Sequence, residues 1–219
     1  MPFTILHLSD LHGNTNFLTQ WEGNTLRPDV TVLTGDITHF GEEKEAKETL
    51  DALRTLFPNI LALHGNCDKS GAEQFLISQN ISLHRRFHVL NEIVFLGVGG
   101  SLPCPGKTPT EYSEKDFEAW LTETYENAGK PGKFVLVTHQ PPYGTSTDKA
   151  MKLIHTGSRA IREFIEHTQP LLCLCGHIHE SVATDRIGKT ILINPGPFRQ
   201  GHLAYITLNN DEQIDIILK

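Results

Sequence analysis

Short apolar runs that alternate with helical patterns constrain the fold of this chain most strongly. Six runs have this character, at Thr4–Leu8, Val30–Leu33, Ile60–Leu63, Ile93–Leu96, Phe134–Val137 and Leu171–Cys175. Their shortness and their lack of polar alternation are typical of strands that are buried on both faces. Helical patterns lie between them, at Glu42–Leu56, Ala72–Gln79, Ser113–Asn127 and Ser158–His167. Such an order predicts β-sheets that are covered by helices.

The pattern changes after residue 180, where closely spaced strands follow one another without helices. We expect them at Ser181–Arg186, Thr190–Asn194, Leu203–Leu208 and Gln213–Leu218, with turns at Gly188-Lys189 and Asn209-Asn210-Asp211. The whole order predicts a mixed α/β fold in which two mixed sheets pack together with helices outside. No linker or repeat divides the 219 residues, so we expect one domain over residues 1–219.

Composition narrows the classes of function. The chain has 19 basic and 26 acidic side chains and a formal charge of −7, which argues against an extended nucleic-acid partner. No apolar run approaches the roughly 18 residues that span a bilayer, and the first residues lack a signal-peptide pattern. We therefore expect a cytoplasmic protein with no membrane partner. The four cysteines show neither Cys-x-x-Cys nor zinc-finger spacing.

Side chains that can bind metal ions follow five of the predicted strands. They are Asp10, His12, Asp36, Asn66, His139, His177 and His179. Because ligands bind at the carboxyl ends of parallel strands, we expect these seven residues to meet at one edge. Carboxylate and amide oxygens mixed with imidazole nitrogens suit Mn²⁺, Fe, Zn²⁺ or Ni²⁺. Seven ligands exceed the needs of one tetrahedral ion, so the sequence predicts two divalent ions that share a carboxylate.

Residues 97–110 contain two fragments that superficially resemble nucleotide-binding loops. Gly97-Val98-Gly99-Gly100 has leucine at the position of the third glycine, and Gly106-Lys107-Thr108 lacks the upstream glycine of a P-loop. Prolines also follow where a helix would have to begin. We interpret the segment as a long loop that can act as a lid.

The motifs at the five strand ends resemble those of the calcineurin-like metallophosphoesterase superfamily, and within it the Icc-related small phosphoesterases. This resemblance implies a four-layer αββα sandwich, and a metal-bridging hydroxide that attacks a small phosphodiester or phosphomonoester. It implies that Asp10, His12 and His179 hold one ion, that Asn66, His139 and His177 hold the other, and that Asp36 bridges them. The family resemblance is also compatible with a homo-oligomer.

One position departs from the family's pattern. The sequence Gly65-Asn66-Cys67-Asp68 has cysteine where the family commonly has a histidine that contacts phosphate and protonates the leaving group. A thiol is a poorer hydrogen-bond partner than imidazolium. By resemblance Asp68 orients this motif, and His155 is the first candidate for the missing acid, ahead of His39 and His84. Cys67, Asp68 and His155 are thus the candidate catalytic residues.

Anion binding has a further candidate at the start of the last predicted helix. Residues 156–158 lead into a helix N-terminus, which attracts anions, and Arg159 is close in sequence. Arg199 is the other arginine near the motifs. A phosphate clamp would require such arginines.

Three alternative functions remain open at this point. A phosphoprotein or nucleotide phosphatase would use the same ligands on a different ester. A non-catalytic interaction scaffold on the same fold is favoured by Cys67, but has no need for seven metal ligands. A nuclease requires a basic surface that this acidic chain does not provide.

Overall fold

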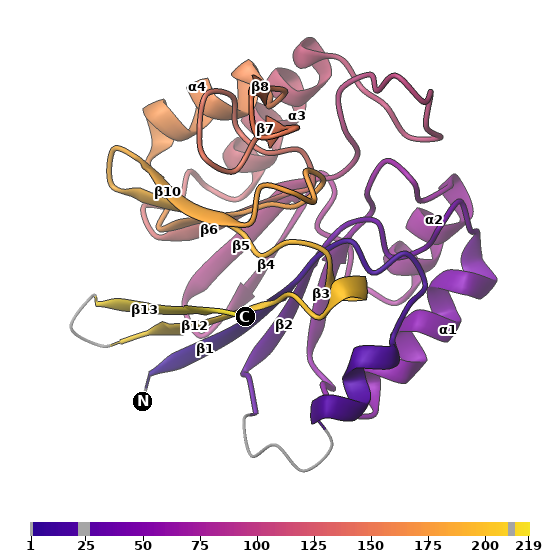
Figure 1. Ribbon diagram of the computed structural model, residues 1–219. Helices are drawn as coiled ribbons and strands as arrows, with labels where there is room; N and C mark the ends of the chain where they lie inside the picture. The colour runs from indigo at the N-terminus through magenta and orange to yellow at the C-terminus, as the bar shows by residue number, and fades with distance from the viewer. Residues whose placement is uncertain (1, 22–26, 210–212) are drawn as a thin grey trace.

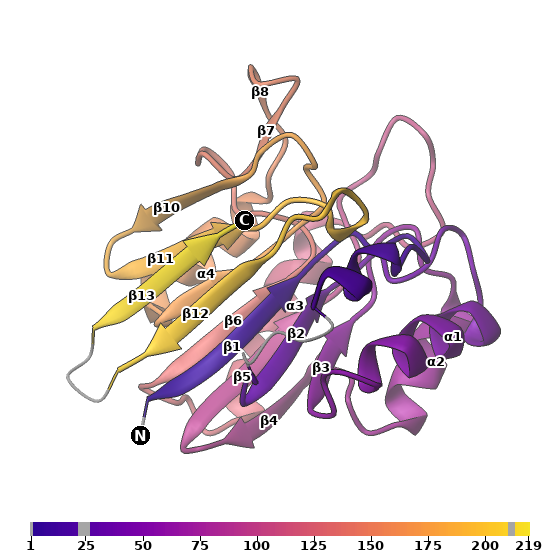
Figure 2. The ribbon, with the colours of Figure 1, turned by 60° about the horizontal axis from the view of Figure 1, so that its bottom comes forward.

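Two β-sheets stack face to face, and a pair of helices covers the outer face of each sheet (Figures 1 and 2). This computed structural model describes residues 2–21, 27–209 and 213–219. The four layers confirm the predicted αββα sandwich of two mixed sheets. No helix in these ranges is long and apolar enough to cross a membrane.

The first sheet has the strand order β13-β12-β1-β2-β3. Its strands are β1 (Phe3–Leu8), β2 (Val30–Thr34), β3 (Ile60–Leu63), β12 (Ala204–Leu208) and β13 (Ile214–Leu218), and its helices are α1 (Glu43–Arg54) and α2 (Ser70–Ser78). Strands β1, β2 and β3 are parallel, whereas β12 and β13 are antiparallel to their neighbours. A 3₁₀ turn, η1 (Asn16–Trp21), follows β1.

The second sheet has the order β10-β11-β9-β6-β5-β4. Its strands are β4 (Arg86–Leu90), β5 (Ile93–Val98), β6 (Phe134–Thr138), β9 (Leu172–Leu174), β10 (Ala183–Ile187) and β11 (Thr190–Asn194), and its helices are α3 (Glu114–Asn127) and α4 (Arg159–Thr168). A small hairpin of β7 (Lys149–Ala150) and β8 (Ile154–His155) projects from the sandwich, and η2 (Phe198–Gln200) precedes β12.

Apolar side chains fill the three spaces between the four layers. Val32 and Phe95 belong to the cluster between the sheets, Leu50 to the cluster under α1 and α2, and Ile165 to the cluster under α3 and α4. This packing fixes the parallel strands, so β1, β2, β3, β6 and β9 all deliver their carboxyl ends to one edge.

The strands and α-helices predicted from the sequence are confirmed with small shifts at their ends, but three short strands and the two 3₁₀ turns, η1 and η2, were missed. Strand β4 is an edge strand whose exposed and half-buried residues give no buried apolar run. Strands β7 and β8 have only two residues each. The Gly188 turn joins β10 and β11, whereas the predicted turn at Asn209-Asn210-Asp211 reaches outside the described residues.

The N-terminus of α4 is already occupied by a carboxylate of the same chain, which corrects the predicted anion site. The Glu114 carboxylate accepts hydrogen bonds from the backbone N–H groups of Arg159 at 2.8 Å and Ala160 at 3.1 Å. It also accepts one from the hydroxyl of Ser158, the N-cap residue. The guanidinium of Arg159 instead lies over the ring of Tyr143, at 4.0 Å from its centroid.

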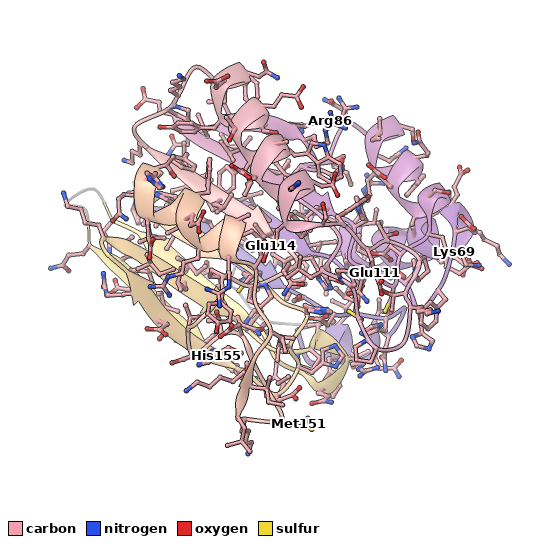
Figure 3. All side chains as sticks on the ribbon, turned by 90° about the horizontal axis from the view of Figure 1, so that it is seen from above. Lys69, Arg86, Glu111, Glu114, Met151 and His155 are labelled. Carbon is pink, nitrogen blue, oxygen red and sulfur yellow. The ribbon has the colours of Figure 1, made fainter. Side chains whose placement is uncertain are left out.

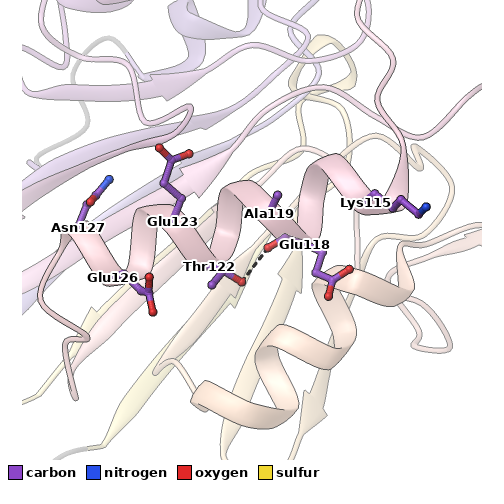
Figure 4. A pocket seen from close by; sticks show the side chains of 7 residues that line it. All are labelled: Lys115, Glu118, Ala119, Thr122, Glu123, Glu126 and Asn127. Atoms are coloured by element: carbon purple, nitrogen blue, oxygen red, sulfur yellow. Dashed lines mark hydrogen bonds between the residues drawn. The ribbon is translucent and has the colours of Figure 1, made fainter.

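Replacing Glu114 by alanine should therefore destabilise the packing of α3 against α4. We expect Glu114→Ala to lower the free energy of unfolding by about 1–2 kcal/mol, because it leaves helix-end N–H groups unpaired. Urea unfolding measures this. Glu118→Ala is the matched control, since Glu118 lies exposed on the same helix and lines a shallow hollow made only of α3 residues (Figure 4). Equal losses in the two variants would contradict the capping role.

His7 illustrates a histidine that serves the core. Its side chain is buried in β1, and its Nε2 lies 2.9 Å from the Thr34 hydroxyl oxygen. Burial lowers the pKa of His7 to about 3, although nearby Asp10 opposes this shift. The folded protein therefore holds His7 neutral through the mildly acidic range.

This burial predicts a specific loss of stability in acid. A histidine whose pKa is depressed on folding contributes stability above its unfolded pKa of about 6.5, and that stability is lost as the pH falls from there toward 3. At pH 5 the loss from His7 alone is about 2 kcal/mol. His7→Leu should flatten the fall in unfolding free energy between pH 6.5 and 4, whereas the exposed control His167→Leu should not. Parallel curves of unfolding free energy against pH for His7→Leu and wild type would refute this role of His7.

Candidate metal centre

The seven predicted metal ligands lie together at the carboxyl edge of the strands, although His177 enters none of the three-residue groups of the described residues whose ligand atoms lie within 4.8 Å of one another. A continuous series of contacts joins their side chains or backbone, in the order Asn66, His139, Asp36, His12, His179, Asp10 and His177. The rings of His139 and His177 also contact each other edge-on, with centroids 5.0 Å apart. The loops of both sheets contribute, so the site lies where the two sheets meet.

Asp10, His12 and His179 form one group whose ligand atoms lie within 4.8 Å of one another. Nε2 of His12 and Nε2 of His179 are 3.3 Å apart, and Nε2 of His179 is 3.2 Å from Oδ1 of Asp10. Two imidazole nitrogens that share one tetrahedral ion lie about 3.3–3.4 Å apart. The spacing of these three residues therefore fits a single divalent ion.

Asp36 lies between two imidazoles. Its Oδ2 is 3.6 Å from Nε2 of His12, and its Oδ1 is 3.5 Å from Nε2 of His139. The carboxylate is almost completely buried and also accepts the backbone N–H of Cys67 at 2.8 Å. Because its two oxygens face different rings, Asp36 occupies the position that a bridging carboxylate requires.

His139 provides the test of whether a cation fits here. Its Nδ1 lies 2.7 Å from the carbonyl oxygen of Thr34 and must donate to it. In the neutral ring Nε2 is then an acceptor, yet it faces the Oδ1 of Asn66 at 2.9 Å and the Oδ1 of Asp36. A cation among these three acceptors would satisfy all of them, and a divalent ion suits this mixture of oxygen and nitrogen donors.

Burial sets the protonation of the centre. It raises the pKa of Asp36 to about 6, and the neighbouring carboxylates Asp10 and Asp68 add to this shift although His139 opposes it. Burial lowers the pKa of His12 to about 4 and that of His177 to about 3. Burial would raise the pKa of Asp10. Hydrogen bonds from His179 and Ser9, together with the charge of His139, outweigh burial and hold this pKa below its usual range. Neutral imidazoles, such as those of His12 and His177, are the form that binds metal ions. Burial also acts to lower the pKa of His179, but the hydrogen bond to Asp10 and the charge of that carboxylate outweigh burial and raise the pKa.

Four of the seven candidate ligands have a strained backbone. Asp10, His12, Asp36 and His177 all have positive φ, between 48° and 68°, a region that residues other than glycine rarely adopt. A Cβ at Gly65 would meet Oδ1 of Asp36 at 2.1 Å, so only glycine permits the approach of this loop to the carboxylate.

The two other candidates near Asn66 differ in their surroundings. Asp68 is buried and accepts the backbone N–H groups of Gly65 at 2.8 Å, Thr38 at 2.7 Å and Ile37 at 3.1 Å, so it ties the loops after β2 and β3 together. The sulfur of Cys67 lies within 4.8 Å of ligand atoms of His12 and Asp36. Burial, with the charge of Asp36, raises the pKa of this thiol.

The candidates for the leaving-group acid separate in space. His155 belongs to the β7–β8 hairpin that carries Met151 (Figure 3), and its Nδ1 is 2.6 Å from Oδ1 of the buried Asp148. His84 packs against Trp120, with ring centroids 5.2 Å apart. His39 contacts the cluster of seven residues directly, because its exposed ring lies 5.6 Å from that of His12.

Two residues support the centre although the sequence offers only weak signals for them. Nη2 of Arg199, from η2, lies 3.1 Å from Nδ1 of His179 and brings positive charge to the rim. Nδ2 of the buried Asn194 donates to the carbonyl of Ile178 at 3.0 Å and holds the loop between His177 and His179. The sequence indicated only that Arg199 lies near the motifs.

The family follows from comparison of the whole chain with known proteins. Residues 3–181 match the family model described as calcineurin-like phosphoesterase. The chain belongs to this family. This calcineurin-like phosphoesterase is 38% identical over 191 residues to the uncharacterized protein MJ1162 of Methanocaldococcus jannaschii, and the match covers 85% of each chain.

More distant relatives agree with this assignment. A probable glycerophosphodiester phosphodiesterase, GpdQ, of Arcobacter nitrofigilis is 25% identical over 203 residues, which cover 88% of this chain and 71% of the relative. The crystal structure of TT1561 of Thermus thermophilus superimposes with a TM-score of 0.71 at 18% identity and covers 99% of both chains. The latter likeness supports the fold.

Divalent ions should stabilise this protein through Asp36. A ligand that binds only the folded state at about 100 times its Kd adds about 2.7 kcal/mol, which for this length corresponds to a rise of about 5–10 °C in Tm. We expect this rise on adding Mn²⁺ or Zn²⁺ to metal-stripped protein, and a much smaller one for Asp36→Asn. Thermal unfolding followed by circular dichroism measures both. The exposed control Asp215→Asn should respond like wild type, and an equal rise in Asp36→Asn would contradict the site.

Proposed function

We propose that this protein hydrolyses a small phosphodiester with two divalent ions held by the seven residues. The observation that carries the proposal is Asp36, whose two oxygens face His12 and His139 in a cluster of acceptors that a cation would satisfy. Asp10, His12 and His179 would hold one ion, and Asn66, His139 and His177 the other, with Asp36 between them. Mn²⁺, Fe, Zn²⁺ and Ni²⁺ all suit these donors.

When bound, the two ions lower the pKa of water and offset negative charge on the phosphate. Groups of the chain itself position the candidate ligands and the substrate. The Thr34 carbonyl fixes the ring of His139 through its Nδ1, and Asp68 fixes the loops that carry Asp36 and Asn66. Arg199 supplies a guanidinium at the rim, where it can bind a phosphate oxygen of the substrate.

We assign the leaving-group acid to His39. Its exposed ring is in contact with His12, so it lies where a substrate on the centre can reach it. Cys67 is a poor proton donor to an alkoxide, since its thiol is buried with a raised pKa. His155 is the alternative acid, because the Asp148 carboxylate orients its ring in the way that carboxylates orient catalytic histidines.

The choice of a small diester rests on two further points. The relative named as a probable glycerophosphodiester phosphodiesterase supports a diester. The charge of −7 opposes long nucleic acids but not a small ester, because two dications outweigh the charges of Asp10 and Asp36 locally. All seven candidate ligands come from one chain, so the proposed site does not require a second copy.

A direct assay tests this function. Metal-stripped protein is supplied with Mn²⁺, Zn²⁺, Fe²⁺ or Ni²⁺ and given bis-p-nitrophenyl phosphate or p-nitrophenyl phosphate. We expect metal-dependent hydrolysis with the diester preferred, and a loss of about 10³-fold or more in Asp36→Asn but not in Asp215→Asn. Preference for the monoester would instead indicate a phosphatase. No hydrolysis with any ion would favour a non-catalytic scaffold.

The identity of the acid is tested by changing the leaving group. His39→Ala should reduce turnover of a glycerophosphodiester by about 10²-fold, because an alkoxide needs a proton. The same variant should change turnover of the nitrophenyl diester only slightly and leave metal content unchanged. His155→Ala is the comparison variant and should behave like wild type on both substrates. If the selective loss occurs in His155→Ala instead, the acid is His155.

A further inference from the structure

The loop over the metal centre brings a second thiol to it. Sγ of Cys104 lies 3.7 Å from Nε2 of His177, a candidate ligand of the second ion. Cys104 is half-buried and stands between Pro103 and Pro105, whose fixed φ angles restrict its backbone. The contact therefore joins a candidate metal ligand to a residue that none of the five strand-end motifs contains.

This loop is held by the same segments that carry the metal ligands. The backbone N–H of Leu102 donates to Oε1 of Gln140, next to His139, at 3.0 Å. The backbone N–H of Thr110 donates to the carbonyl of Asn66 at 3.1 Å, and its hydroxyl donates to the carbonyl of Asp68 at 2.6 Å. Cys104 lies between these two attachments, so its position is coupled to that of the centre.

The distance between sulfur and nitrogen fits two ligands of one ion. Zinc holds a thiolate sulfur at about 2.3 Å and an imidazole nitrogen at about 2.0–2.1 Å, so at a tetrahedral angle the two atoms lie about 3.5 Å apart. The observed 3.7 Å is close to this value. The thiol of Cys104 donates to the Leu102 carbonyl at 3.3 Å, and the Ser101 hydroxyl, which donates to the same carbonyl, lies 3.3 Å from Sγ.

We propose that Cys104 is an additional protein ligand of the ion on the His177 side. This inference rests on the proposed two-ion site and adds a soft donor to it. Binding forms a metal–sulfur bond and breaks the S–H bond, and the proton leaves to water without any change of oxidation state. A thiolate shifts the preference of that position toward Zn²⁺ and Co²⁺ and away from Mn²⁺.

Cobalt spectroscopy tests this inference with a readout that is independent of activity. Metal-stripped protein is titrated with Co²⁺, whose visible ligand-field bands report binding and whose near-ultraviolet sulfur-to-cobalt charge-transfer band reports a thiolate ligand. We expect both signals in wild type, and we expect Cys104→Ser to lose the charge-transfer band while it keeps the visible bands. Cys67→Ser is the matched control, since Cys67 is the other thiol near the cluster, and should keep both signals.

The outcomes separate this inference from the proposed function. Visible bands without charge transfer in wild type, or a charge-transfer band that Cys67→Ser removes and Cys104→Ser retains, would overturn the role of Cys104 and leave the metal site standing. An absence of all bands in wild type would refute the metal site itself. Competition between Zn²⁺ and Mn²⁺ provides a second measurement, in which Cys104→Ser should lower the preference for Zn²⁺ by about tenfold or more.

Discussion

A buried carboxylate that faces two imidazoles is the interaction on which the rest of the site depends. Asp36 has almost no contact with solvent, and its two oxygens point toward His12 and His139. Burying a carboxylate is costly, which is expressed in a pKa raised to about 6. A cation that lies between the carboxylate and the rings removes this cost, so binding and local stability are coupled.

Buried polar residues around the site hold its strained backbone in place. Four of the candidate ligand residues adopt left-handed backbone conformations, which persist only where neighbouring structure enforces them. Asp68 enforces them on one side by binding the loops after β2 and β3, and Asn194 does so on the other by binding the loop after β9. These buried polar residues connect the hydrophobic sandwich to the chemistry at its edge.

The sequence was sufficient to predict the layers and the meeting of the seven candidate ligands, because parallel strands must end at a common edge whatever their loops do. Tertiary contacts outside the strands could not be predicted in this way. Glu114 caps α4 across more than forty residues of chain, and no local sequence pattern predicts that contact. The contact of His39 with His12 depends on the left-handed turn at Asp36, which directs the chain beyond it. The loop that carries Cys104 has no hydrophobic periodicity from which its position could be predicted. Its position depends on hydrogen bonds to other loops.

The central claim is that two ions share Asp36, and anomalous X-ray scattering tests it most directly. Crystals of the protein grown with Mn²⁺ or Zn²⁺ should give two anomalous peaks, one beside Asp10, His12 and His179 and the other beside Asn66, His139 and His177. Both peaks should lie within bonding distance of the Asp36 carboxylate, at the separation of about 3.5–4 Å that is common in two-metal sites. A single peak, or two peaks of which one lies away from Asp36, would contradict the account.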